Sequence, residues 1–121
     1  LRVRKLFGGG MRQVGMLAAA GIHALNHHVE RLSEDHAKAL YLATELANAP
    51  GIEIGGMPET NIVVIKADNA PELGERARKS GVQLSLMDAQ TLRAVTHLDV
   101  SHEEVTKAVE ILGRVLAEQA V

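Results

Sequence analysis

Hydrophobic residues along this chain recur with two different periods, one typical of helices and one typical of strands. From Met11 to Asn26 they return every three or four positions, which predicts a helix with an apolar stripe. Two glycines lower its helix propensity, so packing against another element must hold it together. A second helix is expected from Ser33, its N-cap, to about Asn48. The side chains expected to face the core from this second helix are Ala39, Leu42, Ala43 and Leu46.

Beyond the Ala49-Pro50-Gly51 break the pattern changes to that of short strands rich in β-branched residues. Four strands are predicted, at Ile52–Ile54, Asn61–Ala67, Val82–Met87 and Leu92–Leu98. A helix over Ala70–Ser80, opened by Asn69 and closed by Gly81, separates the second strand from the third. Ser101 and Glu104 have the spacing of a capping box at the start of a last helix. The apolar stripe of that helix comprises Val105, Val109, Leu112 and Leu116.

The order of these elements predicts the fold class. Two helices are followed by two strands, a helix, two strands and a final helix, and 121 residues make room for one compact domain. This order predicts an α+β fold, in which a helical linker segment precedes a small, mostly antiparallel sheet packed on helices.

The composition narrows the possible functions. Phe7 and Tyr41 are the two aromatic residues and Trp is absent, which excludes a nucleic-acid-binding module that stacks bases on aromatic side chains. Because Cys is absent, disulfides, a thiol nucleophile and cysteine-ligated metal centres are excluded as well. This cysteine usage fits a cytoplasmic protein.

Charge is distributed unevenly, although the net charge is only −2. Residues 1–29 carry four basic residues and no acidic residue, whereas residues 30–121 carry nine basic and fifteen acidic ones. A short basic arm on an acidic body indicates that the arm meets an anion or an acidic neighbour. A solvated basic end explains the same charges equally well.

The N-terminal segment only partly resembles a secretory signal. Glycines, Arg12 and Gln13 separate its first basic residues from the apolar run Val14–Ile22, and that run is about half the ~20 residues that would span a bilayer. We therefore expect a soluble protein that does not enter a membrane. Since the chain begins at Leu1 rather than Met, we expect it to be a processed product or a piece of something longer.

The glycine run Gly8–Gly10 lies just before the first predicted helix, between Lys5 and Arg12. Glycines allow backbone N–H groups to approach an anion, and an arginine can bind phosphate through two hydrogen bonds. The spacing is neither that of a Walker motif nor that of a dinucleotide-binding fingerprint. From these residues alone, a flexible hinge into the helix is the simpler interpretation.

Arg93 is a second candidate for binding an anion. In the predicted strand it shares one face with Val95 and His97, while Leu92, Ala94, Thr96 and Leu98 share the other. An arginine fixed in a strand suits bidentate recognition of a carboxylate. An arginine on an edge strand, paired with an exposed acid, is the simpler alternative.

The six histidines do not predict a metal site. His23 and His27 lie four apart on a helix, but no carboxylate shares their turn and no His-Glu-x-x-His pattern is present, which favours a solvated or packed pair. His97, on the face of Arg93, is the one histidine that we retain as a candidate site residue.

Three stretches resemble the low-specificity L-threonine aldolases. Arg4–Gly21, which contains the run Gly-Gly-Gly-Met-Arg-Gln, resembles the segment that links the large and small domains of that family. Arg31–His36 resembles the start of the family's next helix, and Leu92–Ser101 resembles its late strand and the following helix cap. The resemblance covers nearly the whole chain in the right order.

This resemblance implies a pyridoxal-phosphate enzyme of the aspartate-aminotransferase-like fold (fold type I), with residues 1–121 as the C-terminal small domain and its linker helix. Such enzymes cleave L-threonine or L-allo-threonine to glycine and acetaldehyde by a retro-aldol reaction. In this family the arginine that matches Arg93 binds the substrate carboxylate. The residues that match Lys5 and Arg12 lie near the cofactor phosphate or the mouth of the active site of a neighbouring subunit. The resemblance also implies a cytoplasmic homo-oligomer, expected to be a tetramer.

The same resemblance implies that the large cofactor-binding domain is absent from this chain and lies upstream. That domain would carry the Schiff-base lysine, the aspartate facing the pyridine nitrogen, the stacking histidine and the phosphate-binding glycines. None of the lysines in this chain has the expected setting: Lys5, Lys38, Lys66, Lys79 and Lys107. We therefore expect no catalytic residue in this chain, no aldolase activity from it alone, and a large-domain chain as its partner. A stand-alone domain that binds an anionic metabolite and a structural oligomerisation domain stay open as alternatives.

Overall fold

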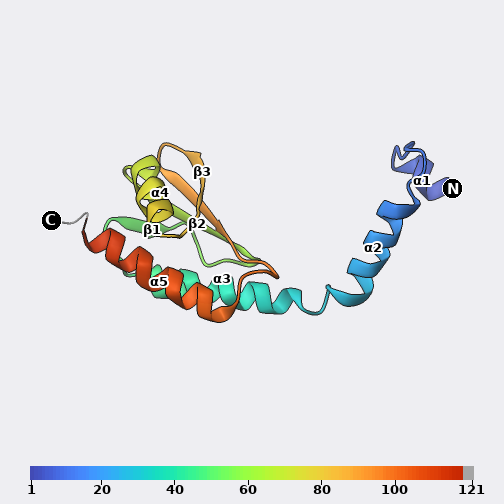
Figure 1. Cartoon of the computed structure of the whole chain (residues 1–121). Helices are drawn as coiled ribbons and strands as arrows, with labels where there is room; N and C mark the ends of the chain where they lie inside the picture. The colour runs from blue at the N-terminus through green and yellow to red at the C-terminus, as the bar shows by residue number, and fades with distance from the viewer. Residues whose placement is uncertain (119–121) are drawn as a thin grey trace. The chain divides into compact units, whose positions relative to one another are not determined.

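The computed structural model of the protein describes residues 1–118 (Figure 1). The chain divides into two compact units, one formed by residues 1–31 and the other beginning at Leu32. The first unit is helical, and the second contains a sheet with its helices.

The first unit contains α1 (Arg2–Leu6) and α2 (Gly15–His27). The helix predicted from Met11 begins only at Gly15, because Gln13 has a positive φ of 48°, which a right-handed helix does not accommodate. The short α1 was not predicted, since five residues are too few to show a helical period. The Gly9 N–H donates to the carbonyl oxygen of Arg4 at 2.7 Å, so the glycine run folds back onto α1. A Cβ at Gly9 would lie 2.9 Å from that same oxygen, and this close approach requires glycine.

The apolar stripe of α2 has no cover within its own unit. None of the residues of α2 is buried, and Met16 and Leu25 are 86% and 71% exposed. A helix of 13 residues with two glycines gains little stability from its own propensity. The predicted need for a packing partner is therefore not met inside this unit.

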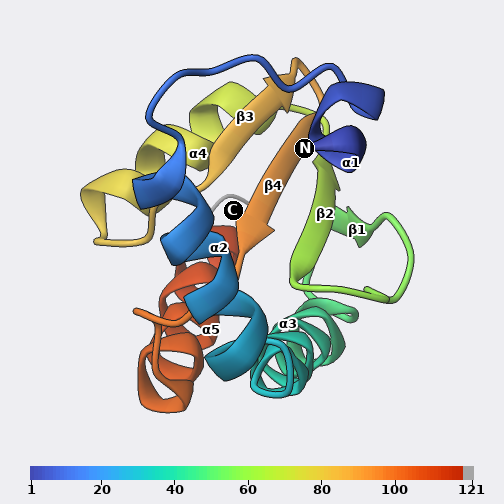
Figure 2. The same ribbon diagram turned by 90° about the vertical axis from the view of Figure 1, so that its right-hand side faces the viewer.

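The second unit is built on a four-stranded antiparallel sheet with the strand order β1-β2-β4-β3 (Figure 2). Its strands are β1 (Ile52–Ile54), β2 (Ile62–Ala67), β3 (Ser85–Asp88) and β4 (Thr91–Val95). Its helices are α3 (Leu32–Leu46), α4 (Ala70–Lys79) and α5 (His102–Ala117). The predicted α+β class, with a small antiparallel sheet packed on helices, is confirmed.

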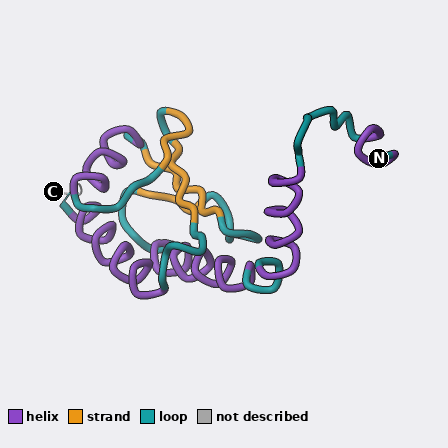
Figure 3. The backbone as a smooth tube through the Cα atoms, turned by 45° about the vertical axis from the view of Figure 1, so that its right-hand side comes forward, coloured by secondary structure: helices purple, strands orange, loops and turns teal. Residues whose placement is uncertain are grey.

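The core of this unit lies between the sheet and its three helices (Figure 3). α3 and α4 pack on the sheet, and α5 packs against both of these helices. The four α3 residues that were expected to face inward are all buried. The largest fully buried side chains are Leu46, Val63, Ile65, Leu73, Leu92 and Leu112. The buried hydrophobic side chains of this core are all aliphatic, as the scarcity of aromatic residues predicted, and Tyr41 packs against them while partly exposed.

Of the three predicted N-terminal helix caps, two are confirmed and one is wrong. Asn69 caps α4 by accepting a hydrogen bond from the Glu72 N–H, and Ser101 forms the predicted capping box with Glu104. The prediction that Ser33 precedes the second helix is wrong, because α3 already begins at Leu32.

β2 is one residue shorter than predicted, and two other strands are each two residues shorter. β3 begins at Ser85 rather than Val82, because the Val82 N–H still bonds the carbonyl of Ala77 at the end of α4. β4 ends at Val95, and a turn follows in which the Val100 N–H donates to the carbonyl of His97 at 3.1 Å. Leu98, expected to share a strand face with Leu92, lies in this turn and is 57% exposed.

Candidate functional site

Arg93 lies in the interior of the sheet, because its strand β4 runs between β2 and β3. It pairs in register with Val64 on one side and with Ser85 on the other. Its chain neighbours Leu92 and Ala94 are buried on the helix-covered face, so Arg93 lies on the opposite face, as the alternation predicted. The alternative of an edge-strand arginine is wrong.

The guanidinium of Arg93 has no acceptor among the residues that the structure describes. Its Nε is buried and makes no hydrogen bond, and no ion pair joins Arg93 to an acid within residues 1–118. A buried donor without an acceptor costs about 1–3 kcal/mol, and more when the group is charged. A bound carboxylate would supply the missing acceptors through two hydrogen bonds to the planar guanidinium.

The surroundings of Arg93 on this face are mixed, with Val64, Ile62 and Val95 as apolar neighbours and Ser85 and the pair Lys66 and Thr91 as polar ones. Val64 lies beside it, and the pair Ile62 and Val95 occupies the next register position, where the two residues are 39% and 40% exposed. The backbone approaches closely here as well, because a Cβ at Gly55 would lie 3.0 Å from Cγ1 of Val64. Apolar neighbours lower the local dielectric constant, which strengthens the attraction between Arg93 and a carboxylate.

The structure does not bring His97 into contact with Arg93. β4 ends two residues before His97, so strand alternation no longer places this side chain. The His97 Nδ1 accepts a hydrogen bond from the Asp99 N–H at 3.3 Å and lies 3.6 Å from the Asp99 carboxylate. The imidazole itself is exposed.

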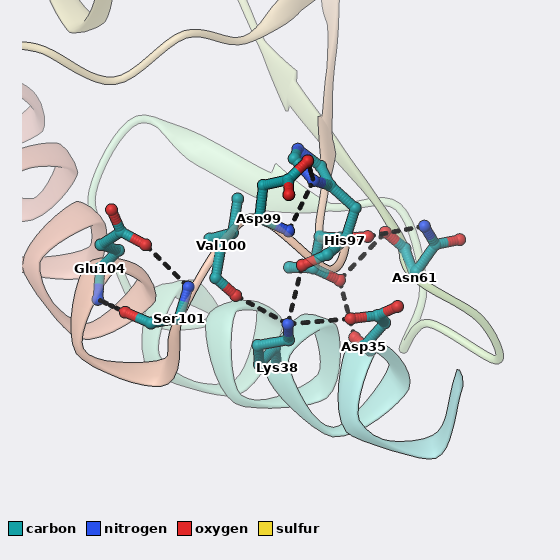
Figure 4. Close-up of polar contacts among 9 residues, drawn as sticks. Asp35, Lys38, Asn61, His97, Asp99, Val100, Ser101 and Glu104 are labelled. Carbon is teal, nitrogen blue, oxygen red and sulfur yellow. Dashed lines mark hydrogen bonds and ion pairs between the residues drawn. The ribbon is translucent and has the colours of Figure 1, made fainter. Parts of the chain in front are cut away.

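A buried polar network holds the end of β4, and the sequence reasoning missed it (Figure 4). Lys38 forms an ion pair of 2.8 Å with Asp35, and both residues are buried in α3. The Thr96 hydroxyl, also buried, donates to the carbonyl of Asp35 at 2.6 Å. In the sequence, the Asp35–Lys38 ion pair is indicated by the i, i+3 spacing of these two residues immediately before the inward-facing Ala39.

Lys5 and Arg12 both belong to the first unit, whereas Arg93 belongs to the second. Lys5 lies in the last turn of α1, and Arg12 lies in the segment between the glycine run and α2. Both are exposed, and neither forms an ion pair with any residue of the described part of the chain. The glycine run does not lead directly into α2, because residues 11–14 intervene. The position of these two basic groups relative to a cofactor stays a prediction.

The other candidate groups give weaker evidence of a functional site. The rings of His23 and His27 stack with centroids 4.3 Å apart, and no group of three or more His, Asp or Glu within residues 1–118 could hold a metal ion. None of the helices described is long and apolar enough to cross a membrane.

Two carboxyl groups have lowered pKa values. The Ser101 backbone N–H donates to the Glu104 carboxylate and lowers its pKa, and a hydrogen bond from Arg78 lowers the pKa of Glu75. Both shifts arise from helix contacts at the surface.

A sequence model of the beta-eliminating lyases matches residues 1–70. The chain belongs to the beta-eliminating lyase family. It is 42% identical over 109 residues to the low specificity L-threonine aldolase of Escherichia coli (strain K12), which is 88% of this chain and 32% of that protein. It is 36% identical over 118 residues to the probable low-specificity L-threonine aldolase of Schizosaccharomyces pombe, which is 98% of this chain and 30% of that protein. The chain thus spans about a third of these curated relatives, and its predicted resemblance to them is confirmed.

Solved structures of proteins with lower sequence identity share the fold of this member of the beta-eliminating lyase family. The 8-amino-7-oxononanoate synthase of Francisella tularensis superposes with a TM-score of 0.63 at 20% identity, over 88% of this chain and 34% of that one. LysN, an α-aminoadipate aminotransferase of Thermus thermophilus solved with N-(5'-phosphopyridoxyl)-L-leucine, superposes with a TM-score of 0.62 at 18% identity, over 80% of this chain and 28% of that one. These neighbours are fold-type I pyridoxal-phosphate enzymes, so the predicted fold type is confirmed.

Proposed function

We propose that this chain is the C-terminal small domain, with its linker helix, of a pyridoxal-phosphate-dependent threonine aldolase. The complete enzyme would cleave L-threonine or L-allo-threonine to glycine and acetaldehyde by a retro-aldol reaction. The names of the relatives support this reaction. The observation in the structure that carries the proposal is the buried, unpartnered Nε of Arg93 on the sheet face opposite the one that the helices cover.

Arg93 would bind the carboxylate of the amino-acid substrate. Its strand has neighbours on both sides, so the backbone beneath the guanidinium is held by two ladders of hydrogen bonds. A carboxylate held by two hydrogen bonds to a fixed guanidinium keeps the amino acid in the site, in the ground state and in the transition state alike. Pyridoxal phosphate, when bound, would be held mainly by the large domain and would supply the electron sink that the cleavage requires.

Lys5 and Arg12 would bind near the cofactor phosphate or at the mouth of the active site of a neighbouring subunit. Both are exposed cations without an acidic partner in the described part of the chain, and the first unit carries no acid before Glu30. This local excess of positive charge attracts a phosphate dianion.

The lysine that binds the cofactor covalently would lie in the large domain. Lys38 is unsuited to that role because its ammonium is buried in an ion pair and donates to two backbone carbonyls. Lys66 and Lys79 pair with Glu53 and Glu75 at the surface. Of the other two, Lys5 lies beside the glycine run and Lys107 lies on the exposed side of α5.

A large domain, and a further subunit, would cover the apolar stripe of α2. A chain that spans about a third of its relatives leaves about two thirds of such an enzyme to be supplied. We propose that the complete enzyme is a cytoplasmic homo-oligomer, and specifically a tetramer, as the family resemblance implies.

The proposal is tested by comparing this chain with the longer protein in which a cofactor-binding domain precedes it. With L-threonine and pyridoxal phosphate, the longer protein is expected to release acetaldehyde, and the 121-residue chain is expected to release none. Release of acetaldehyde by the chain alone, or by neither protein, would contradict the proposal.

A further inference from the structure

Lys38 uses all of its hydrogen-bonding capacity inside the protein. Its ammonium lies 2.8 Å from Oδ1 of Asp35, and it donates to the carbonyl oxygens of His97 at 2.9 Å and of Val100 at 2.7 Å. These three partners match the three donors of an ammonium group. Since the side chain is only 10% exposed, water contributes little to its solvation, and the three partners must replace it.

The two carbonyls that bind Lys38 are the ends of the turn that follows β4. Within this turn the Val100 N–H donates to the carbonyl of His97, and the Asp99 N–H donates to the His97 imidazole. Lys38 reaches this turn from α3, which lies about sixty residues earlier in the chain. A buried cation therefore holds together two carbonyl groups that would otherwise repel each other.

The same cluster anchors the last residue before the turn. The Thr96 hydroxyl donates to the backbone of Asp35, and the Thr96 N–H donates to the carbonyl of Asn61 at 3.0 Å. The Asn61 side-chain amide in turn donates to the carbonyl of Thr96 at 2.7 Å. The C-terminal end of β4 is thus bound to α3 on one side and to the residue before β2 on the other (Figure 4).

We infer that Lys38, with Asp35 as its counter-ion, is a positioning residue for Arg93. Arg93 lies three residues before Thr96 on the strand whose end this cluster fixes. A bidentate contact tolerates only about 0.5 Å of displacement, so the strand must be held at its end as well as along its ladders. This inference rests on the proposed role of Arg93 in binding the substrate carboxylate.

The test uses the double variant Asp35→Asn/Lys38→Met in the longer, cofactor-loaded protein. This variant removes the two hydrogen bonds to the turn without leaving a buried unpaired charge. Lys79→Met serves as the control for loss of a lysine, because that side chain is 69% exposed on α4. Asn69→Ala, which removes the cap of α4, serves as the control for loss of stability. Arg93→Lys is the reference for loss of the carboxylate contact.

In the double variant, KM for the amino acid is expected to rise about three- to tenfold while kcat changes less than about twofold, since a displaced Arg93 weakens ground-state and transition-state binding alike. Both controls are expected to leave KM unchanged. In the 121-residue chain, the Val100 amide should exchange its hydrogen at least about tenfold faster in the double variant, with no such change for Asn69→Ala.

Two results separate the inference from the function on which it rests. A KM raised by Arg93→Lys but unchanged in the double variant would leave the proposed function standing and overturn the positioning role. An unchanged KM in Arg93→Lys would overturn the carboxylate-binding role and the inference with it. A fall in kcat with unchanged KM in the double variant would also overturn the positioning role.

Discussion

Replacing Lys38 with methionine removes one charge of a buried ion pair and leaves the other in place. The Asp35 side chain is only 5% exposed, so its carboxylate would lose its cation without gaining water. Removing one partner of a buried pair costs about 3–5 kcal/mol. In the double variant Asp35→Asn/Lys38→Met no charge is stranded, and the lost hydrogen bonds to the His97 and Val100 carbonyls cost about 1–3 kcal/mol. The single variant should therefore be less stable than the double variant by about 2 kcal/mol.

Urea unfolding of the 121-residue chain, followed by circular dichroism, measures this difference. The linear dependence of unfolding free energy on urea should keep its slope in both variants, so that a change in midpoint reports stability directly. A Lys38→Met variant as stable as the double variant, or destabilised by less than about 1 kcal/mol, would refute the reasoning that this pair is buried and coupled.

Three further experiments test other parts of the structure. Ser101→Ala removes the cap of α5 and should lower the unfolding free energy by about 1 kcal/mol at neutral pH. Since Ser101 lowers the pKa of Glu104 below 4.5 in the folded state, the stabilisation is present above that value and is lost as the pH falls through the lowered one. Because the larger cause is the backbone N–H of Ser101, which alanine keeps, the variant that should flatten the dependence of stability on acidic pH is Glu104→Gln, and an unchanged acid profile in Glu104→Gln would count against the capping box. Leu92→Ala empties a fully buried site beneath Arg93 and should cost about 2–5 kcal/mol in the same urea assay, whereas a cost below about 1 kcal/mol would show that the core is misplaced. Limited proteolysis of the chain alone should cut within residues 1–31 first, because α2 has no buried residue, and equal resistance of both units, read by mass spectrometry, would argue against this division.

The sequence predicted most of the second unit because its elements follow local rules. The spacing of Ala39, Leu42 and Leu46 marked the buried stripe of α3, and Ser101 with Glu104 marked the start of α5. Strand ends were less predictable, because hydrogen bonds outside the strands determine them. Val82 remains bonded to the end of α4, and the turn after Val95 is held by a lysine from a distant helix.

The candidate site was predicted only in part. The alternation of residues placed Arg93 on the face opposite Leu92, and this is what the structure has. The position of β4 inside the sheet could not be predicted, because it follows from the strand order, which depends on tertiary pairing. The Asp35–Lys38–Thr96 cluster joins residues about sixty positions apart, so no local pattern could indicate the contact with the turn. Residues before Gly15 departed most from prediction, since a positive φ at Gln13 leaves no periodic signal.

The binding of the substrate carboxylate by Arg93 is the central claim, and steady-state kinetics of Arg93→Lys in the longer, cofactor-loaded protein test it most directly. Lysine keeps the charge but loses the planar, bidentate contact. KM for L-threonine should rise by about tenfold or more, with a much smaller change in kcat, because the contact is made equally in the ground state and the transition state. A variant with the KM and kcat of the parent protein would contradict the claim and remove Arg93 from the site.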